Sequence, residues 1–196
     1  DPEDLDDIRV GVNTWGRFPS LATQLQSELG ARGASAADVS AGCAGFVYAV
    51  EEAYNRMCVE KLRDGRDTLA LVVGVDGLSH ITNWRDRSTC VLLGDGAGAV
   101  VLSQVEEGGI RSIHTHADGR YGDALYSAAV LETQRDPDGP EPFSNKQNGT
   151  RPYLHMDGPK VYGIAVRSMV RDIKKVIAKY NSSNGNEPIG LDDIDY

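Results

Sequence analysis

The chain has 196 residues, of which 40% are hydrophobic and 25% are charged, a composition typical of a soluble globular protein with a core of its own. Its formal net charge of −9 argues against a nucleic-acid-binding protein, which needs a basic surface to contact phosphates. No stretch approaches the roughly 18 consecutive apolar residues of a membrane-spanning helix, and the acidic first residues do not resemble a signal peptide. A cytoplasmic protein without a membrane partner is therefore expected.

The first predicted elements alternate between strands and helices. Alternating apolar residues predict a strand over residues 7–14. Phe18-Pro19-Ser20 begins a helix that ends near Gly30, because proline is tolerated at a helix start and glycine at its end. A short apolar strand over residues 36–41 follows. An amphipathic helix then runs to about Arg63.

Strands dominate the middle of the chain. Residues 68–75 form a continuous apolar, β-branched run, which is typical of a strand covered on both faces. Residues 88–93 and 97–103 are predicted as two more strands, joined by a turn at Gly94-Asp95-Gly96. Strand–helix–strand alternation followed by adjoining strands indicates a layered α/β fold.

The last part of the chain begins with a polar stretch. Residues 132–151 are rich in Pro, Asp, Asn and Gly, which predicts a long surface loop. An amphipathic helix is predicted over residues 159–180, and residues 193–196 are predicted to begin a strand.

Cys43 is the most informative residue of the chain. It lies in the segment Ala-Gly-Cys-Ala-Gly-Phe before the long helix, where unpaired N–H groups and the helix dipole favour the nucleophilic thiolate. The small neighbours would let a substrate carbonyl approach. The alternative is a buried cysteine with a packing role. Together with Cys58 and Cys90 it makes an odd set without a C-x-x-C pair, so neither a disulfide framework nor a metal site is expected.

A second motif, Gly-Asp-Gly-Ala-Gly-Ala-Val-Val-Leu at residues 94–102, lies downstream. Together with residues 38–46 and further matches in order along the chain, it resembles the 3-ketoacyl-ACP synthase III family of the thiolase superfamily. The resemblance implies a thiolase-like αβαβα fold, with residues 1–157 forming most of the first half and residues 158–196 the start of the second. The Gly-rich segment lacks the Lys-Ser/Thr of a P-loop, so a structural turn near Cys43 is predicted.

The resemblance also implies a reaction. Cys43 would take an acyl group from acyl-CoA and then condense it with malonyl carried on acyl carrier protein, with no resident cofactor. Members of the family complete the site with a His and an Asn, which match sequence beyond residue 196. The chain is thus expected to be an internal fragment that cannot condense unaided. The alternatives are an inactive scaffold or partner subunit, or an acyl-transferring homologue of secondary metabolism.

Several residues match family positions around the substrate. Phe18 matches a residue that caps the acyl pocket of the partner in a homodimer, although its alternative is a hydrophobic staple of its own helix. Leu78 and Leu93 match the acyl pocket, with core packing as the alternative. Arg87 matches a family arginine near the CoA nucleotide, and Trp84 and Arg85 beside it are expected to stack on the adenine, with a solvated loop as the alternative. The matches along the pantetheine tunnel are Met156, Gly158 and Tyr162.

Basic side chains recur along one face of the last predicted helix. Because acyl carrier proteins are acidic, this face is predicted to dock the carrier protein, with a solvated helix surface as the alternative. The residues concerned are Arg167, Arg171, Lys174, Lys175 and Lys179.

Overall fold

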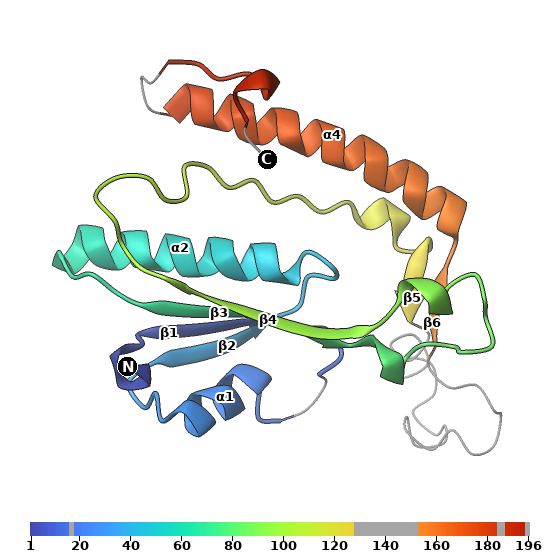
Figure 1. Cartoon of the computed structure of the whole chain (residues 1–196), viewed down its shortest axis with the longest axis horizontal. Coiled ribbons are helices and arrows are strands. Elements are labelled where there is room, and N and C mark those ends of the chain that lie inside the picture. The colour runs from blue at the N-terminus through green and yellow to red at the C-terminus, as the bar shows by residue number, and fades with distance from the viewer. Residues whose placement is uncertain (16–17, 128–152, 184–186, 195–196) are drawn as a thin grey trace. The chain divides into compact units, whose positions relative to one another are not determined.

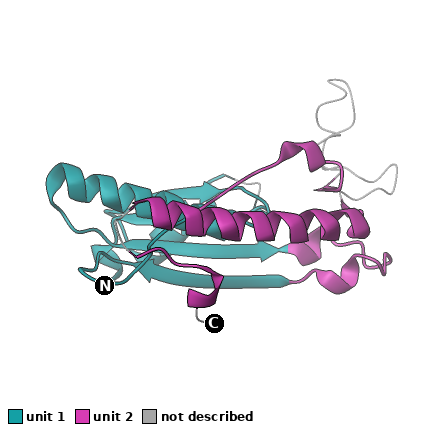
Figure 2. Ribbon diagram, turned by 90° about the horizontal axis from the view of Figure 1, so that it is seen from above, with its two compact units in different colours: residues 1–77, 95–113 teal, residues 78–94, 114–196 magenta. Residues whose placement is uncertain are grey.

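A computed structural model describes residues 1–15, 18–127, 153–183 and 187–194. The chain forms two compact units, shown in Figure 2. Unit 1 comprises residues 1–77 and 95–113, and unit 2 comprises residues 78–94 and 114–196.

Unit 1 is built on a four-stranded sheet with the strand order β2-β1-β3-β4 (Figure 1). Strands β1 (Asp7–Gly11), β2 (Ser35–Val39) and β3 (Ala70–Gly77) run parallel, and β4 (Asp95–Leu102) pairs antiparallel with β3. Helix α1 (Leu21–Leu29) covers one face of the sheet and α2 (Gly45–Asp64) covers the other. The predicted alternation of strands and helices is confirmed.

Each face of the sheet has its own apolar core. Ile8 and Val10 of β1 are fully buried in the cluster that contains Ala22 of α1. On the opposite face, Ala49 and Ala53 of α2 belong to the cluster that includes residues of β3. Alanines at the contact let α2 approach the sheet closely, and this fixes where its first residues lie.

Local signals set the helix ends much as predicted. The Ser20 side chain accepts a hydrogen bond from the Thr23 N–H at 3.2 Å and caps the start of α1. Gly30 and Gly65 end α1 and α2 in the left-handed conformation, with φ of 71° and 68°.

Of the two strands predicted to be joined by a glycine turn, the second, over residues 97–103, is confirmed as β4, but the first, over residues 88–93, and the turn are wrong. Residues 90–92 form a short 3₁₀ helix, because the Asp86 carbonyl accepts from the Cys90 N–H at 3.0 Å and keeps the chain coiled. Strand β4 begins at Asp95, and Gly98 pairs with Gly74 of β3. The glycine-rich segment is therefore part of the sheet and does not form a tight turn.

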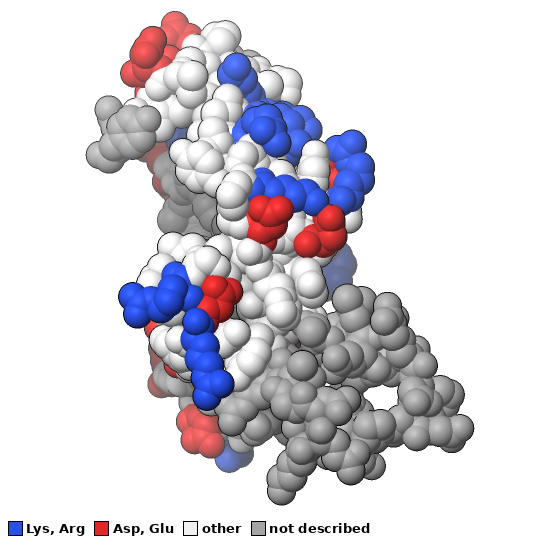
Figure 3. Space-filling view, turned by 90° about the vertical axis from the view of Figure 1, so that its right-hand side faces the viewer, with Lys and Arg blue, Asp and Glu red and all other residues white. Residues whose placement is uncertain are grey.

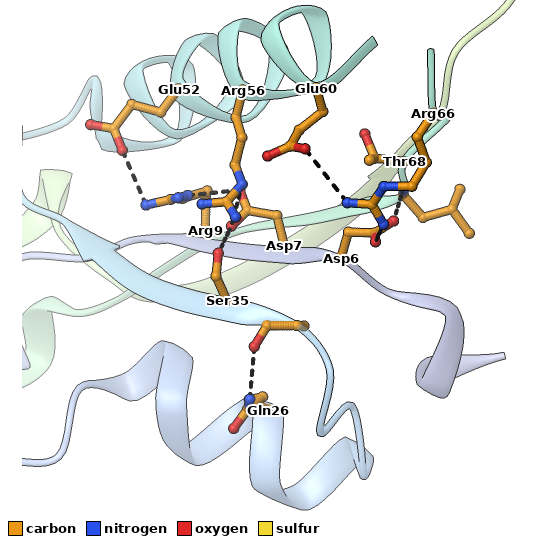
Figure 4. A network of polar contacts seen from close by, with 12 residues as sticks. Asp6, Asp7, Arg9, Gln26, Ser35, Glu52, Arg56, Glu60, Arg66 and Thr68 are labelled. Carbon is orange, nitrogen blue, oxygen red and sulfur yellow. Dashed lines mark hydrogen bonds and ion pairs between the residues drawn. The ribbon is translucent and has the colours of Figure 1, made fainter. Parts of the chain in front are cut away.

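A buried carboxylate joins the strands to α2 (Figure 4). Asp7 is 2% exposed. It receives the Arg9 guanidinium at 2.8 Å, the Ser35 hydroxyl and, at 3.9 Å, Arg56 of α2. Removing one partner of a buried charge lowers the stability of a protein by about 3–5 kcal/mol, so the network fixes β1, β2 and α2 relative to one another.

Unit 2 contains an antiparallel pair of strands, β5 (Leu125–Ser127) and β6 (Leu154–Met156), followed by helix α4 (Gly158–Ser183). The helix was predicted over residues 159–180. A 3₁₀ turn at residues 191–193 stands where a strand was predicted to begin, and residues 195–196 lie outside the described part, as does the predicted loop over 132–151. Within the described ranges, no helix is long and apolar enough to span a bilayer.

Candidate active site

Cys43 lies in the short loop that connects β2 with α2. Gly42 adopts a φ of 57°, and its carbonyl accepts from the Gly45 N–H at 3.0 Å, so the chain turns sharply before the helix begins. The Cys43 thiol is free and exposed. The prediction that this cysteine immediately precedes the long helix is confirmed, and the alternative of a buried packing residue is wrong.

The head of α2 packs closely on the strands below it. A Cβ at Gly11, the last residue of β1, would stand 2.4 Å from the Gly45 carbonyl carbon. A Cβ at Gly74 of β3 would stand 3.2 Å from the Phe46 side chain. The absence of side chains at these two positions lets the helix start lie against the sheet, and Cys43 is positioned by this contact.

The loop before Cys43 is held by a side chain from another strand. Asn13, just after β1, donates from Nδ2 to the Gly42 carbonyl at 3.0 Å and accepts the Gly42 N–H at 3.0 Å. The same Nδ2 donates to Asp76 of β3 at 3.1 Å, and Ser40 Oγ donates to Asn13 Oδ1 at 3.2 Å. Asn13 thus connects three parts of the chain.

Asp76 is the acceptor at the base of this arrangement. Burial raises its pKa, but hydrogen bonds donated by the backbone and side chains of Asn13 and Thr14 outweigh burial and hold the pKa of Asp76 below its ordinary value. The carboxylate is therefore ionised at neutral pH. Asn13 and Asp76 were missed in the sequence, although both are polar residues at the carboxyl ends of apolar parallel strands, where sites in α/β proteins gather.

Comparisons with known proteins point to one family. A family model described as 3-oxoacyl-[acyl-carrier-protein (ACP)] synthase III matches residues 37–119. The β-ketoacyl-[acyl-carrier-protein] synthase III of Alkalilimnicola ehrlichii is 42% identical over 190 residues, which are 96% of this chain and 53% of the relative. The chain thus spans about half the length of the curated relatives that it matches.

Solved structures give the same result. The β-ketoacyl-ACP synthase III of Thermus thermophilus superimposes with a TM-score of 0.73 at 36% identity, over 91% of this chain and 51% of that chain. The priming β-ketosynthase of the R1128 polyketide biosynthetic pathway superimposes with a TM-score of 0.69 at 30% identity, over 88% of this chain and 48% of that chain. Over 96% of its length the chain is similar to a member of the 3-oxoacyl-ACP synthase III family. Its thiolase-like α/β fold, predicted from the sequence, is confirmed.

The residues matched to the family's substrate site are divided between the two units. Cys43 and Phe18 belong to unit 1. The remaining matches all belong to unit 2, and they are Leu78, Trp84, Arg87, Leu93, Met156, Gly158 and Tyr162. The domain boundary predicted at residue 157 falls between the end of β6 and the start of α4 and stays a prediction.

Phe18 is fully exposed ahead of α1. It therefore makes no apolar contact with its own helix, and the hydrophobic-staple alternative is wrong. Its role in capping a partner's pocket stays a prediction.

Trp84 and Arg87 occupy one loop of unit 2, and both are exposed. The loop is ordered by Asp86, which accepts from Ser88 Oγ at 2.6 Å and from Thr89 Oγ1 at 2.7 Å. These bonds, that of Ser88 first, hold the pKa of Asp86 below its ordinary value. The loop therefore presents a ring and a guanidinium on a fixed backbone.

The other matches in unit 2 lie before β6, within it and at the start of α4. The Leu154 N–H donates to the Ile81 carbonyl at 2.8 Å, which ties β6 to the segment that contains Leu78 and Leu93. Both leucines are half-buried, as is Met156, whereas Tyr162 is 74% exposed on α4. The hydrogen bond thus joins the strand before α4 to the segment that contains Ile81, and the substrate site around these residues stays a prediction.

The basic face of α4 is less uniform than the sequence suggested. Arg171 is bound to Asp172 at 2.8 Å and to His116 Nδ1 at 3.0 Å. Lys174 and Lys175 are exposed, as are Arg167 and Lys179. Figure 3 shows one face of the molecule, on which basic side chains stand beside acidic ones. Carrier-protein docking stays a prediction, and the exposed Lys174 and Lys175 are better candidates for it than Arg171.

Proposed function

We propose that this chain carries the nucleophile of a 3-oxoacyl-ACP synthase III-type acyltransferase and that Cys43 is its acyl acceptor. The observation that supports this most is an exposed free thiol directly before α2, at the carboxyl ends of three parallel strands, in a loop fixed by Asn13. A thiol in such a place is open to a thioester carbonyl. The N–H groups at the start of a helix favour the negative charge that develops there.

The first half-reaction is acyl transfer from acyl-CoA. The Cys43 sulfur forms a bond to the carbonyl carbon, the bond from that carbon to the CoA sulfur breaks, and CoA leaves as the thiol with the proton. In the second half-reaction, malonyl-ACP loses CO₂ and its carbanion attacks the acyl carbon, which yields 3-oxoacyl-ACP and free Cys43. Condensation in the family uses a His and an Asn, and we propose that these come from sequence outside the 196 residues.

The proposal extends to substrates and assembly. Trp84 and Arg87 would contact the nucleotide of CoA, with Met156, Gly158 and Tyr162 along its pantetheine arm. Half-buried Leu78 and Leu93 would line the acyl pocket together with a partner's Phe18. A homodimer is supported by the exposure of Phe18 and by β4, an edge strand on which Val101 is 61% exposed, because unpaired apolar edges favour association.

A second candidate is a priming ketosynthase of a polyketide pathway. The 30% identity to the R1128 enzyme favours it, and the chemistry at Cys43 would be the same. The two candidates differ in the starter acyl group and in the carrier protein.

The experiment is acylation followed by peptide mass spectrometry. The chain is incubated with acetyl-CoA and with longer acyl-CoAs, and the acyl group is expected on Cys43, with none in Cys43→Ala. Cys58 and Cys90 are half-buried in the same protein and serve as internal controls. Acylation of either of them with Cys43 unmodified would overturn the proposal, and the chain-length profile separates the two candidates.

A further inference from the structure

We propose that Asn13 and Asp76 are positioning residues for Cys43: Asp76 fixes the orientation of the Asn13 amide, and this amide fixes both peptide groups of Gly42. The catalytic meaning of this inference rests on the proposed acyl transfer at Cys43. The hydrogen bonds from which it is argued do not depend on that proposed function.

Asp76 accepts on both of its oxygens. Oδ1 accepts from the Asn13 N–H at 2.9 Å, the Thr14 N–H at 2.9 Å and Thr14 Oγ1 at 3.0 Å. Oδ2 accepts from Asn13 Nδ2 at 3.1 Å. Thr14 Oγ1 in turn accepts the Gly77 N–H at 2.9 Å. The carboxylate thus holds the chain after β1 against the end of β3.

An ionised carboxylate has no donor, so only the NH₂ end of the Asn13 amide can face it. This choice places Asn13 Oδ1 toward the Gly42 N–H and leaves the second hydrogen of Nδ2 for the Gly42 carbonyl. With the amide turned the other way, Oδ1 would face the Asp76 carboxylate, and Gly42 would lose the hydrogen bonds of its N–H and its carbonyl. Burial raises the pKa of Asp76, but the hydrogen bonds that the carboxylate accepts lower it by more. Asp76 therefore stays ionised and selects one orientation of the Asn13 amide.

Gly42 is the residue through which this orientation reaches the thiol. Its carbonyl belongs to the peptide group that carries the Cys43 N–H, and its own N–H belongs to the preceding peptide group. Two bonds from one side chain therefore fix both peptide planes around Gly42, which adopts a φ of 57° and has no side chain of its own to restrict its rotation. A backbone N–H beside the nucleophile stabilises the developing thioester oxyanion only when it is aimed correctly.

The test uses three variants of the chain. Asn13→Ala removes both bonds to Gly42. Asp76→Asn places an NH₂ group opposite Asn13 Nδ2 and turns the amide. The double variant Asn13→Asp with Asp76→Asn exchanges the two groups, which restores a donor–acceptor pair between them and an acceptor for the Gly42 N–H. The double variant still lacks the donor to the Gly42 carbonyl.

Two rates are compared at Cys43. Acetyl transfer from acetyl-CoA needs an aimed backbone, whereas alkylation by iodoacetamide needs only an accessible sulfur. Each single variant is expected to lower acetyl transfer by about tenfold to a hundredfold, because small misplacements of reacting groups have effects of this size. Alkylation should fall by a smaller factor, and the exchange variant should exceed both single variants in acetyl transfer.

Controls come from exposed residues elsewhere in unit 1. Asn55→Ala makes the same chemical change within α2, and Asp67→Asn makes it beyond the end of α2. Both variants should leave both rates at Cys43 unchanged. Equal losses of acetyl transfer and alkylation, or single variants that acetylate at the wild-type rate, would overturn the positioning role.

Amide hydrogen exchange separates this inference from the proposed function. Residues 41–45 should exchange faster in the single variants than in the wild type, while the centre of α2 remains protected. Unchanged exchange at residues 41–45 overturns the inference even if acylation falls. A wild-type chain that is alkylated but never acetylated at Cys43 overturns the proposed function, and the exchange measurement still decides the geometry.

Discussion

Replacing Gly11 with alanine tests how the head of α2 is held. The new Cβ would stand 2.4 Å from the Gly45 carbonyl carbon, 2.6 Å from the Phe46 nitrogen and 2.7 Å from the Gly45 oxygen. Non-bonded carbon atoms rest at about 3.5–4.0 Å, so β1 and the start of α2 must separate by roughly 1 Å. All three obstacles are backbone atoms, which cannot rotate away as a side chain can.

The expected cost follows from two opposing terms. Overpacking of a close contact costs about 1–3 kcal/mol, and backbone obstacles place Gly11→Ala at the upper end. The lower entropy of the unfolded chain with alanine returns about 0.4–1 kcal/mol. A net loss of about 2 kcal/mol in the free energy of unfolding is therefore expected, which is a fall in Tm of about 4–8 °C for a chain of this size.

Gly45→Ala is the matched control from the other side of the same contact. Its Cβ would meet Gly11 Cα at 3.4 Å and the Val39 oxygen at 3.5 Å, which are ordinary contact distances. Alanine favours the helix, so this variant should match the wild type or gain up to about 1 kcal/mol. Chemical denaturation followed by circular dichroism measures both variants. A Gly11→Ala protein within about 0.5 kcal/mol of the wild type, or a Gly45→Ala protein that is equally unstable, would refute the reasoning.

Three further outcomes are expected. Replacing Lys174 and Lys175 with Glu in the full-length enzyme should raise KM for malonyl-ACP at low salt and leave acylation by acyl-CoA unchanged. The effect should shrink as added salt screens the charges. An unchanged KM would show that these lysines are solvated surface residues without a docking role. The pKa of Asp76 is lowered by folding, so its carboxylate stabilises the protein above the unfolded value of about 3.9 and loses this effect as pH falls through the folded value. The stability difference between wild type and Asp76→Asn should therefore close below about pH 4 in urea titrations, and a difference constant down to pH 2 would contradict this. Light scattering should find a dimer of the full-length enzyme whose acyl-chain selectivity changes in Phe18→Ala, and a monomer with the same selectivity would count against the shared pocket.

Local chemistry explains what could be predicted from the sequence. The ends of α1 and α2 depend on residues within one turn, such as Ser20, Gly30 and Gly65, so the pattern alone placed them. Cys43 was singled out because its neighbours in sequence are also its neighbours in space.

The failures have the opposite origin. Residues 88–93 have the β-branched composition of a strand, but the Asp86 backbone and side chain coil the segment, and a periodicity count does not include such bonds. Asn13 and Asp76 are 63 residues apart, so only their shared place at the carboxyl ends of parallel strands, and no local pattern, indicates that they meet. Arg171 lies on the predicted basic face, yet its partner His116 comes from a distant segment.

The sequence separation of the Asn13 bonds has a consequence for the order in which the protein is made. The bonds from Asn13 to Gly42 span 29 residues and those to Asp76 span 63. During synthesis, β1, α1, β2 and Cys43 emerge well before the carboxylate that orients the Asn13 amide. The thiol is thus present on the nascent chain before its surroundings are set, and the arrival of β3 completes them. Cleavage in the exposed segment at residues 65–67, between α2 and β3, would place Asn13 and Gly42 on one fragment of the finished protein and Asp76 on the other.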